Sequence, residues 1–263
     1  MVNSIWKRLG RWLGGPESES APPELAGEAD QSIYERTPRR VVAFAWEAPE
    51  GPAPGASWHV DGVGVHRVVC GTRFLFASGG VESDLQLGGE GLAAGLALRT
   101  SLSGGASWVL CPLAEQPITI DGAPVAGPTV LSDGDSIRFA ERVELGVRLP
   151  DPASAACVLE NLCEGEVDTA RRTLLLPPGT SGRARVGSTS RAHVQTSRFE
   201  TPLFVEFGGT KLRLVSDVPF THGAGAPVTE LDLPFPPARL EVVSMGSAEG
   251  ARPPFELSFA PLA

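Results

Sequence analysis

Apolar and polar residues alternate with a period of two through much of this chain, and turn-forming residues separate the alternating runs. The clearest series spans residues 108–149, with short apolar runs at 118–120, 137–139 and 143–147. Asp121-Gly122 closes the first run into a tight hairpin, because this pair tolerates the positive φ that two-residue loops need. Strands joined by short turns, without intervening helical patterns, predict an all-β sandwich.

Further strands are predicted on both sides of this series. They cover residues 41–44 with Trp46, 58–60, 63–70, 73–77, 83–87, 92–99, 173–176, 203–207, 212–214 and 240–243. Residues 153–162 are apolar without a clear period, so a strand and a short helix are both compatible with this segment.

The first 15 residues carry a helical pattern. Ile5, Leu9 and Trp12 recur at i, i+4 and i+7, opposite basic residues, and glycines and a proline follow at 14–16. The amphipathic segment 4–13 is compatible with weak docking to a membrane surface or a partner groove, and equally with a loosely held terminus. Residues 16–38 are rich in Pro, Glu, Ser and Ala and are predicted to be a disordered linker.

Two motifs in the central series resemble a known family. Ile-Asp-Gly-Ala-Pro-Val (120–125), followed by Leu-Ser-Asp-Gly-Asp-Ser-Ile-Arg-Phe (131–139), is similar to the last half of a forkhead-associated (FHA) domain. The resemblance extends over residues 74–149. It implies an FHA-like β-sandwich, a protein partner, and a setting in serine/threonine-kinase signalling or in assembly of a bacterial-type complex.

The second half of the chain repeats features of the first at an offset of about 104 residues. Gly208-Gly209 before residues 212–214 corresponds to Gly104-Gly105 before residues 108–110, and 225–228 corresponds to 122–125. Residues 191–195 align with 83–87. The predicted organisation is a helix (1–15), a linker (16–38), an FHA-like sandwich (39–150), a connector (151–170) and a second, degenerate FHA-like sandwich in tandem (171–263).

The first predicted sandwich lacks the family's phosphothreonine ligands. The resemblance assigns these to an arginine after a glycine, a serine-arginine pair with a nearby histidine, and an asparagine. The matching positions are Gly79-Gly80, residues 93–96 (Ala-Ala-Gly-Leu) and Gln116-Pro117. With no cation facing it, a phosphate dianion would lose its hydration without compensation. We therefore expect a protein-interaction or scaffold module that has lost phosphothreonine binding.

A second candidate binding segment lies near a predicted strand end. Its polar residues are Arg185, Ser188, Ser190, Arg191 and His193. Serine, arginine and histidine echo the family's phosphate ligands, so the alternative hypothesis is a genuine phosphopeptide-binding adaptor that uses Arg185–His193. The spacing after Gly187 is shorter than in the family, and a solvated basic turn is the other interpretation.

Other chemistry finds little support in the pattern of residues. Ser190, His193 and Asp217 would be needed for a hydrolase on a β-scaffold, but no Gly-x-Ser-x-Gly elbow surrounds the serine. Two groups of candidate metal ligands lack the spacing of a zinc site. One group is Cys157 with Cys163, and the other is His59, His66 and Cys70. We expect no cofactor, no metal and no enzymatic activity.

Charge and cysteine usage narrow the partners and the compartment. The net charge of −9 argues against nucleic acid, which requires a concentrated basic face. The four cysteines are too scattered for a disulfide framework, which predicts a reduced, cytoplasmic protein, and Cys111 is expected to be a core thiol. Neither a secretory signal nor an apolar run of membrane-spanning length is predicted.

Overall fold

The computed structural model describes residues 40–79, 82–101, 105–140, 142–163, 171–198, 201–246 and 254–262. Regular structure in these ranges is β-strand, apart from one short 3-10 turn at Thr180–Gly182, so the fold is all-β as predicted. None of these ranges contains a helix that is long and apolar enough to cross a membrane. The predicted helix 1–15 and linker 16–38 lie outside the described residues.

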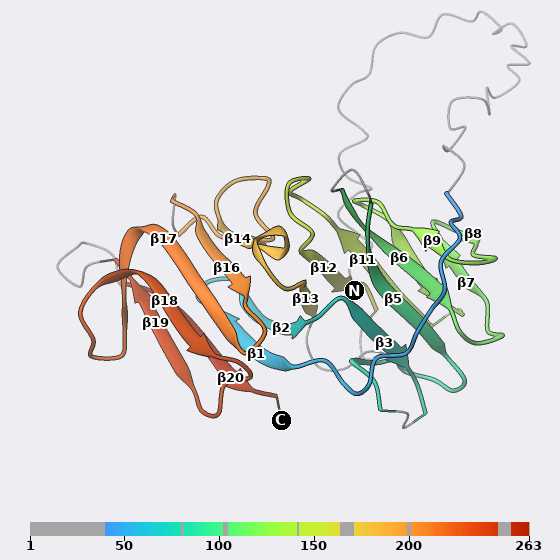
Figure 1. Cartoon of the computed structure of the whole chain (residues 1–263), viewed down its shortest axis with the longest axis horizontal. Helices are drawn as coiled ribbons and strands as arrows, with labels where there is room; N and C mark the ends of the chain where they lie inside the picture. The colour runs from blue at the N-terminus through green and yellow to red at the C-terminus, as the bar shows by residue number, and fades with distance from the viewer. Residues whose placement is uncertain are drawn as a thin grey trace, which may run out of the picture. The chain divides into compact units, whose positions relative to one another are not determined.

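The strands form two sheets (Figure 1). The five-stranded sheet has the order β4-β3-β5-β6-β9. Its strands are β3 (Arg73–Ala77), β4 (Leu85–Gln86), β5 (Ala93–Thr100), β6 (Ala106–Pro112) and β9 (Thr129–Val130). The large sheet has the order β15-β14-β16-β17-β19-β20-β1-β2-β13-β12-β11-β10-β7-β8, with β18 paired to β17. Its strands are β1 (Gly55–Val60), β2 (Gly64–Cys70), β7 (Ile118–Ile120), β8 (Ala123–Pro124), β10 (Ser136–Phe139), β11 (Val143–Arg148), β12 (Cys157–Asn161), β13 (Arg172–Leu176), β14 (Ala184–Gly187), β15 (Val194–Gln195), β16 (Leu203–Phe207), β17 (Lys211–His222), β18 (Val228–Pro234), β19 (Glu241–Met245) and β20 (Phe255–Pro261).

The predicted strand series of residues 108–149 is confirmed. Ile120 pairs with Ala123 across a two-residue loop, in which Asp121 and Gly122 have φ of 48° and 78°. Positive φ at both loop positions suits the right-handed twist of the flanking strands. The strand predicted over 143–147 is β11, and its residues alternate between buried and half-buried as a two-sided strand requires.

Three strands of the large sheet separate two hydrophobic cores. The first core surrounds Phe74 and Trp108, and the second surrounds Trp58 and Phe259. The wall between them consists of β2, β12 and β13, whose successive residues point into opposite cores. The second core receives Val68, Cys70, Val158, Leu174 and Leu176, whereas the first receives Val69, Cys157, Leu159 and Leu175.

Burial on both faces explains why the sequence pattern did not distinguish a strand from a short helix over residues 153–162. A strand with one exposed face shows alternation, but a strand that is apolar on both faces reads as a continuous apolar run. The segment resolves as β12, which pairs with β11 and β13.

The cores do not coincide with the ranges 39–150 and 171–263 expected from the sequence. Strands β1 and β2 come from the first range, yet β1 pairs with β20 and its Trp58 stacks on Phe259 with ring centroids 5.4 Å apart. Strand β12 comes from the expected connector 151–170. The division of the chain into two tandem sandwiches therefore stays a prediction.

Residues 40–47 do not form the strand predicted for 41–44 and Trp46. They make one bridge, Val41 to Thr129, and otherwise lie along the five-stranded sheet. Trp46 lies on Gly95 of β5, where a Cβ atom would be 2.4 Å from the indole ring. Since the glycine leaves room for the ring, Trp46 joins Val109 and Cys111 in a small apolar cluster, and the expectation of a buried Cys111 is confirmed.

Because the wall is shared, we predict that both cores unfold in one transition. Leu174→Ala opens the second core and Leu175→Ala the first, and each should lower the free energy of unfolding by about 2–5 kcal/mol. Urea denaturation of the full chain, followed by tryptophan fluorescence and far-UV circular dichroism, measures this. Leu162→Ala, at a side chain that is 54% exposed, is the control and should change stability by about 0.5 kcal/mol at most. Two transitions, each sensitive to only one core substitution, would contradict the prediction.

Candidate binding site

The polar segment singled out from the sequence does not gather into one site. Arg185 lies in β14, and His193 directly precedes β15. Ser188, Ser190 and Arg191 are exposed in the loop between these strands, and their side chains make no hydrogen bond or ion pair with any described residue. The structure therefore joins Arg185 to His193 and leaves the other three side chains in solvent.

His193 holds the backbone of β14. The backbone N–H of Arg185 donates to Nδ1 of His193 over 3.1 Å, and the backbone N–H of His193 donates to the carbonyl oxygen of Arg185 over 2.9 Å. The imidazole is buried, and its Nε2 has no partner among the described residues. Burial lowers the pKa of His193 to about 4, so the ring is neutral and acts as an acceptor in the fold.

Asp84 holds the corresponding position in the five-stranded sheet. Its Oδ2 accepts from the backbone N–H of Leu75 over 2.6 Å, and its own N–H donates to the carbonyl oxygen of Leu75 over 2.8 Å. Burial raises the pKa of Asp84, while the backbone donors on its carboxylate oppose that rise. The sequence alignment of 83–87 with 191–195 placed Asp84 opposite Ala192. The shared hydrogen-bond pattern moves that alignment by one residue and makes His193 the counterpart.

Arg183 and Arg185 already have partners on the sheet. The guanidinium carbons of Arg183 and Arg185 lie 4.8 Å and 5.3 Å from the centre of the Phe204 ring. Arg183 also forms an ion pair with Glu206, and Nη2 of Arg185 lies 3.9 Å from Asp151. Cation–π contacts and an ion pair of this kind account for both cations without a ligand.

The residues that a hydrolase or a metal site would need are likewise not gathered into one site in the described part of the chain. Ser190 and Asp217 are exposed, whereas His193 is buried with Nδ1 engaged by the backbone. Of the two candidate metal sets, Cys157 is buried and Cys163 half-buried in the first, and His66 and Cys70 are buried but His59 is exposed in the second. Within the described ranges, no three His, Cys, Asp or Glu residues are grouped in a way that could hold a metal ion.

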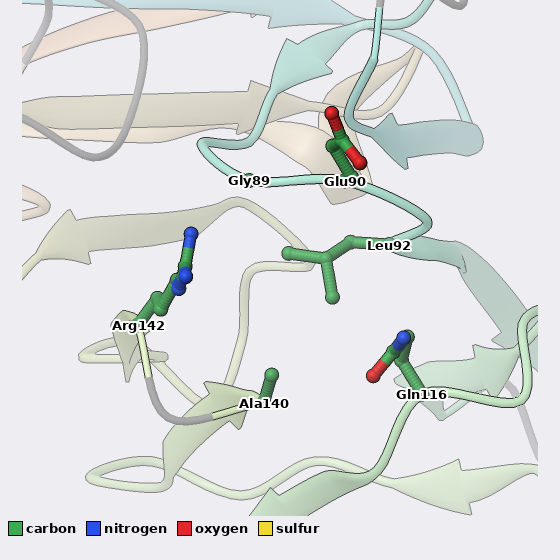
Figure 2. A pocket seen from close by; sticks show the side chains of 6 residues that line it. All are labelled: Gly89, Glu90, Leu92, Gln116, Ala140 and Arg142. Atoms are coloured by element: carbon green, nitrogen blue, oxygen red, sulfur yellow. The ribbon is translucent and has the colours of Figure 1, made fainter.

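A pocket of about 620 Å³ lies among three loops of the first core (Figure 2). The loops are β4–β5, β6–β7 and β10–β11. Leu92 and Ala140 form its apolar part, and the charged or polar side chains come from Glu90, Gln116 and Arg142. We name this the three-loop pocket.

Backbone hydrogen bonds fix the loops around the three-loop pocket. Ser78 binds Leu92 twice, since its Oγ accepts from the Leu92 N–H over 2.9 Å and its N–H donates to the Leu92 carbonyl over 3.1 Å. The N–H of Ala140 donates to the carbonyl of Pro117 over 2.9 Å, which ties the β10–β11 turn to the β6–β7 loop. Ala140 has a φ of 49°, a left-handed conformation unfavourable for alanine that these contacts hold in place.

Two glycines of the β4–β5 loop lie close to polar side chains of the pocket. A Cβ atom on Gly89 would be 4.0 Å from Nη1 of Arg142, and one on Gly91 would be 3.8 Å from Nε2 of Gln116. Both glycines have left-handed φ, of 94° and 71°, so other residues there would be strained. The Arg142 side chain makes no ion pair or hydrogen bond with a described residue.

Sequence reasoning missed Arg142 for a physical reason. The residue-by-residue match to the FHA pattern covers residues 79–80, 93–96 and 116–117, which include Gln116 but no cation. Arg142 comes from the β10–β11 turn, and only the sandwich packing brings that turn beside the other two. The available signal was an arginine in the turn that follows the buried strand end at Phe139, three residues further along the chain.

Comparisons of the chain with protein-family models, curated proteins and solved structures found no match. The site is therefore defined by its geometry, and the resemblance to the FHA family stays a prediction.

Two buried histidines predict a loss of stability in mild acid. Burial lowers the pKa of both His66 and His193 to about 4, against about 6.5 in the unfolded chain. The unfolded chain alone takes up these protons as the pH falls from about 6.5 towards 4, so stability is full above this window and declines through it, by up to about 3 kcal/mol per histidine. Urea denaturation between these pH values measures the slope.

The substitution His193→Gln should flatten this slope, whatever it does to stability at neutral pH, because glutamine does not titrate. His59→Gln is the matched control, since His59 is exposed, and should leave the slope unchanged. An unchanged slope in His193→Gln would show that the imidazole is not the source.

Proposed function

We propose that this chain is a non-catalytic protein-interaction module, in which an FHA-like β-sandwich presents the three-loop pocket to a segment of a partner protein. The observation that carries the proposal is a preformed pocket at the loop end of a strand scaffold, with a guanidinium that pairs with no described residue. Its volume lies within the range of about 300–1,000 Å³ usual for ligand sites. Loops on a rigid sheet are common binding surfaces, and here backbone hydrogen bonds already fix them.

The pocket favours an interaction role without phosphothreonine recognition. The ionisable side chains among its described lining residues are Arg142 and Glu90, which have opposite charges. Phosphate sites commonly use charge-assisted donors that outweigh nearby carboxylates. The loss of the family's phosphate ligands at Gly79 and residues 93–96 agrees with this interpretation.

The phosphopeptide hypothesis based on Arg185–His193 receives less support. His193 serves as a buried backbone acceptor, and Arg185 stacks on Phe204. Ser188, Ser190 and Arg191 remain accessible in solvent, so this loop supplies a useful comparison site.

We also propose a cytoplasmic setting, in which the module holds signalling or assembly partners. The four cysteines are free thiols, and three of them are buried, as suits a reducing compartment. The kinase-signalling context comes from the FHA resemblance alone, and fold does not by itself fix function.

Selection of a random unphosphorylated peptide library on the full chain tests the proposed function. Enriched peptides should bind the wild type. They should bind the double variant Gln116→Ala/Arg142→Ala roughly tenfold or more weakly, because two exposed donors are removed. Fluorescence anisotropy with labelled peptides gives the dissociation constants.

The matched control is Ser190→Ala/Arg191→Ala, which removes two exposed polar side chains of the β14–β15 loop and should leave affinity unchanged. The proposal fails if the enriched peptides are insensitive to the pocket variant. Binding that requires phosphothreonine and Arg191 would instead establish the rival adaptor.

A further inference from the structure

We infer that the three-loop pocket selects a carboxylate on an unphosphorylated partner segment, with Arg142 and Gln116 as its donors and Glu90 as the group that disfavours phosphate. The inference rests on the proposed function, because it names the chemistry that the same pocket would recognise. The carboxylate would come from an aspartate or glutamate side chain or from a free carboxyl terminus.

The donors in the pocket suit a planar acceptor with two oxygens. Arg142, Glu90 and Gln116 come from three different loops and line the same pocket, and in the view of Figure 2 the Leu92 side chain lies between Arg142 and Gln116. A guanidinium presents parallel N–H groups that match a carboxylate, and the Gln116 amide can supply a further N–H donor. The closeness of Nη1 of Arg142 to Gly89, and of Nε2 of Gln116 to Gly91, places both donors along one loop.

Glu90 distinguishes a monoanion from a dianion. Among the described residues the lining carries one positive and one negative side chain, so attraction to Arg142 and repulsion from Glu90 partly offset each other for any anion. Both interactions double when the ligand's charge doubles, but the cost of removing an ion from water grows with the square of its charge. A carboxylate therefore enters more readily than a phosphate dianion.

The apolar part of the pocket fits the stem of an acidic side chain. Leu92 is only 5% exposed and lies beside the half-buried Ala140 at the base of the loops. The methylene groups of glutamate can pack there while the carboxylate reaches Arg142. Since Ser78 and Pro117 already fix the surrounding loops, little conformational freedom remains to be lost on binding.

The test uses capped pentapeptides, acetyl-Gly-Ala-X-Ala-Gly-amide, in which X is glutamate, glutamine or phosphothreonine. A further probe has X as glutamine and a free carboxyl terminus. Each is titrated to millimolar concentration into the isotope-labelled full chain and followed by nuclear magnetic resonance. The glutamate probe should shift the amide signals of Gly89, Gly91 and Gln116 and bind roughly tenfold or more tightly than the glutamine probe. The free-terminus probe shows whether a chain end supplies the carboxylate instead.

Substitutions in the pocket make the inference specific. Arg142→Gln should abolish the preference for glutamate over glutamine, and Arg142→Lys should keep part of it, because lysine offers charge without the planar fork. Glu90→Gln should strengthen the binding of the glutamate probe and of the phosphothreonine probe, and the gain should be larger for phosphothreonine. Arg191→Gln, which removes an exposed arginine outside the pocket, should change nothing.

The two proposals fail in different ways. If the library peptides depend on the pocket but neither the glutamate probe nor the free-terminus probe binds more tightly than the capped glutamine probe, or phosphothreonine binds more tightly than both carboxylate probes, the carboxylate inference is wrong and the interaction role stands. If no carboxylate probe shifts the pocket amides, the carboxylate inference is also overturned. If the library peptides in addition ignore the pocket variant, both proposals fall.

Discussion

Burial of both faces of β2, β12 and β13 is the constraint on which the rest of the structure depends. Leu174 and Leu176 face one core and Leu175 faces the other, so this part of the wall has no face for a polar side chain. The wall's charged residues lie beyond this part, where Glu160 of β12 binds Arg172 of β13 over 3.0 Å and Arg67 lies in the middle of β2. Strands that come from both halves of the chain complete the wall, and the two cores therefore depend on each other.

Strands β3 to β6 and β14 to β17 repeat one arrangement on either side of this wall. In each, a short strand runs parallel to the first strand of the group, and two antiparallel partners follow. In each group a side chain next to the short strand accepts a hydrogen bond from the backbone of the first strand. The acceptor is the Asp84 carboxylate in one group and the His193 imidazole in the other. Asp84 also accepts from the N–H of Ala53 over 2.5 Å and thereby anchors the chain before β1, whereas Nε2 of His193 has no such partner.

This exchange of acceptors gives His193 a structural role in the segment that resembles a phosphate site. Ser190, Arg191 and His193 resemble a phosphate-binding series, but His193 is required where the backbone of β14 needs an acceptor. The residues that form the three-loop pocket carry no such signature, because Glu90, Gln116 and Arg142 come from separate loops. A binding assignment for this molecule therefore follows from the loops that the sandwich brings together.

The sequence by itself determined the features that are local. Alternation over 143–147 specified a strand, and Asp121-Gly122 specified its turn, because side-chain period and turn conformation depend on neighbouring residues. Tertiary structure alone decided that residues 157–161 form a wall strand, that β1 pairs with β20, and that Arg142 lies beside Gln116. These outcomes depend on contacts between residues far apart in the chain, and a strand buried on both faces gives no alternation from which its partners can be inferred.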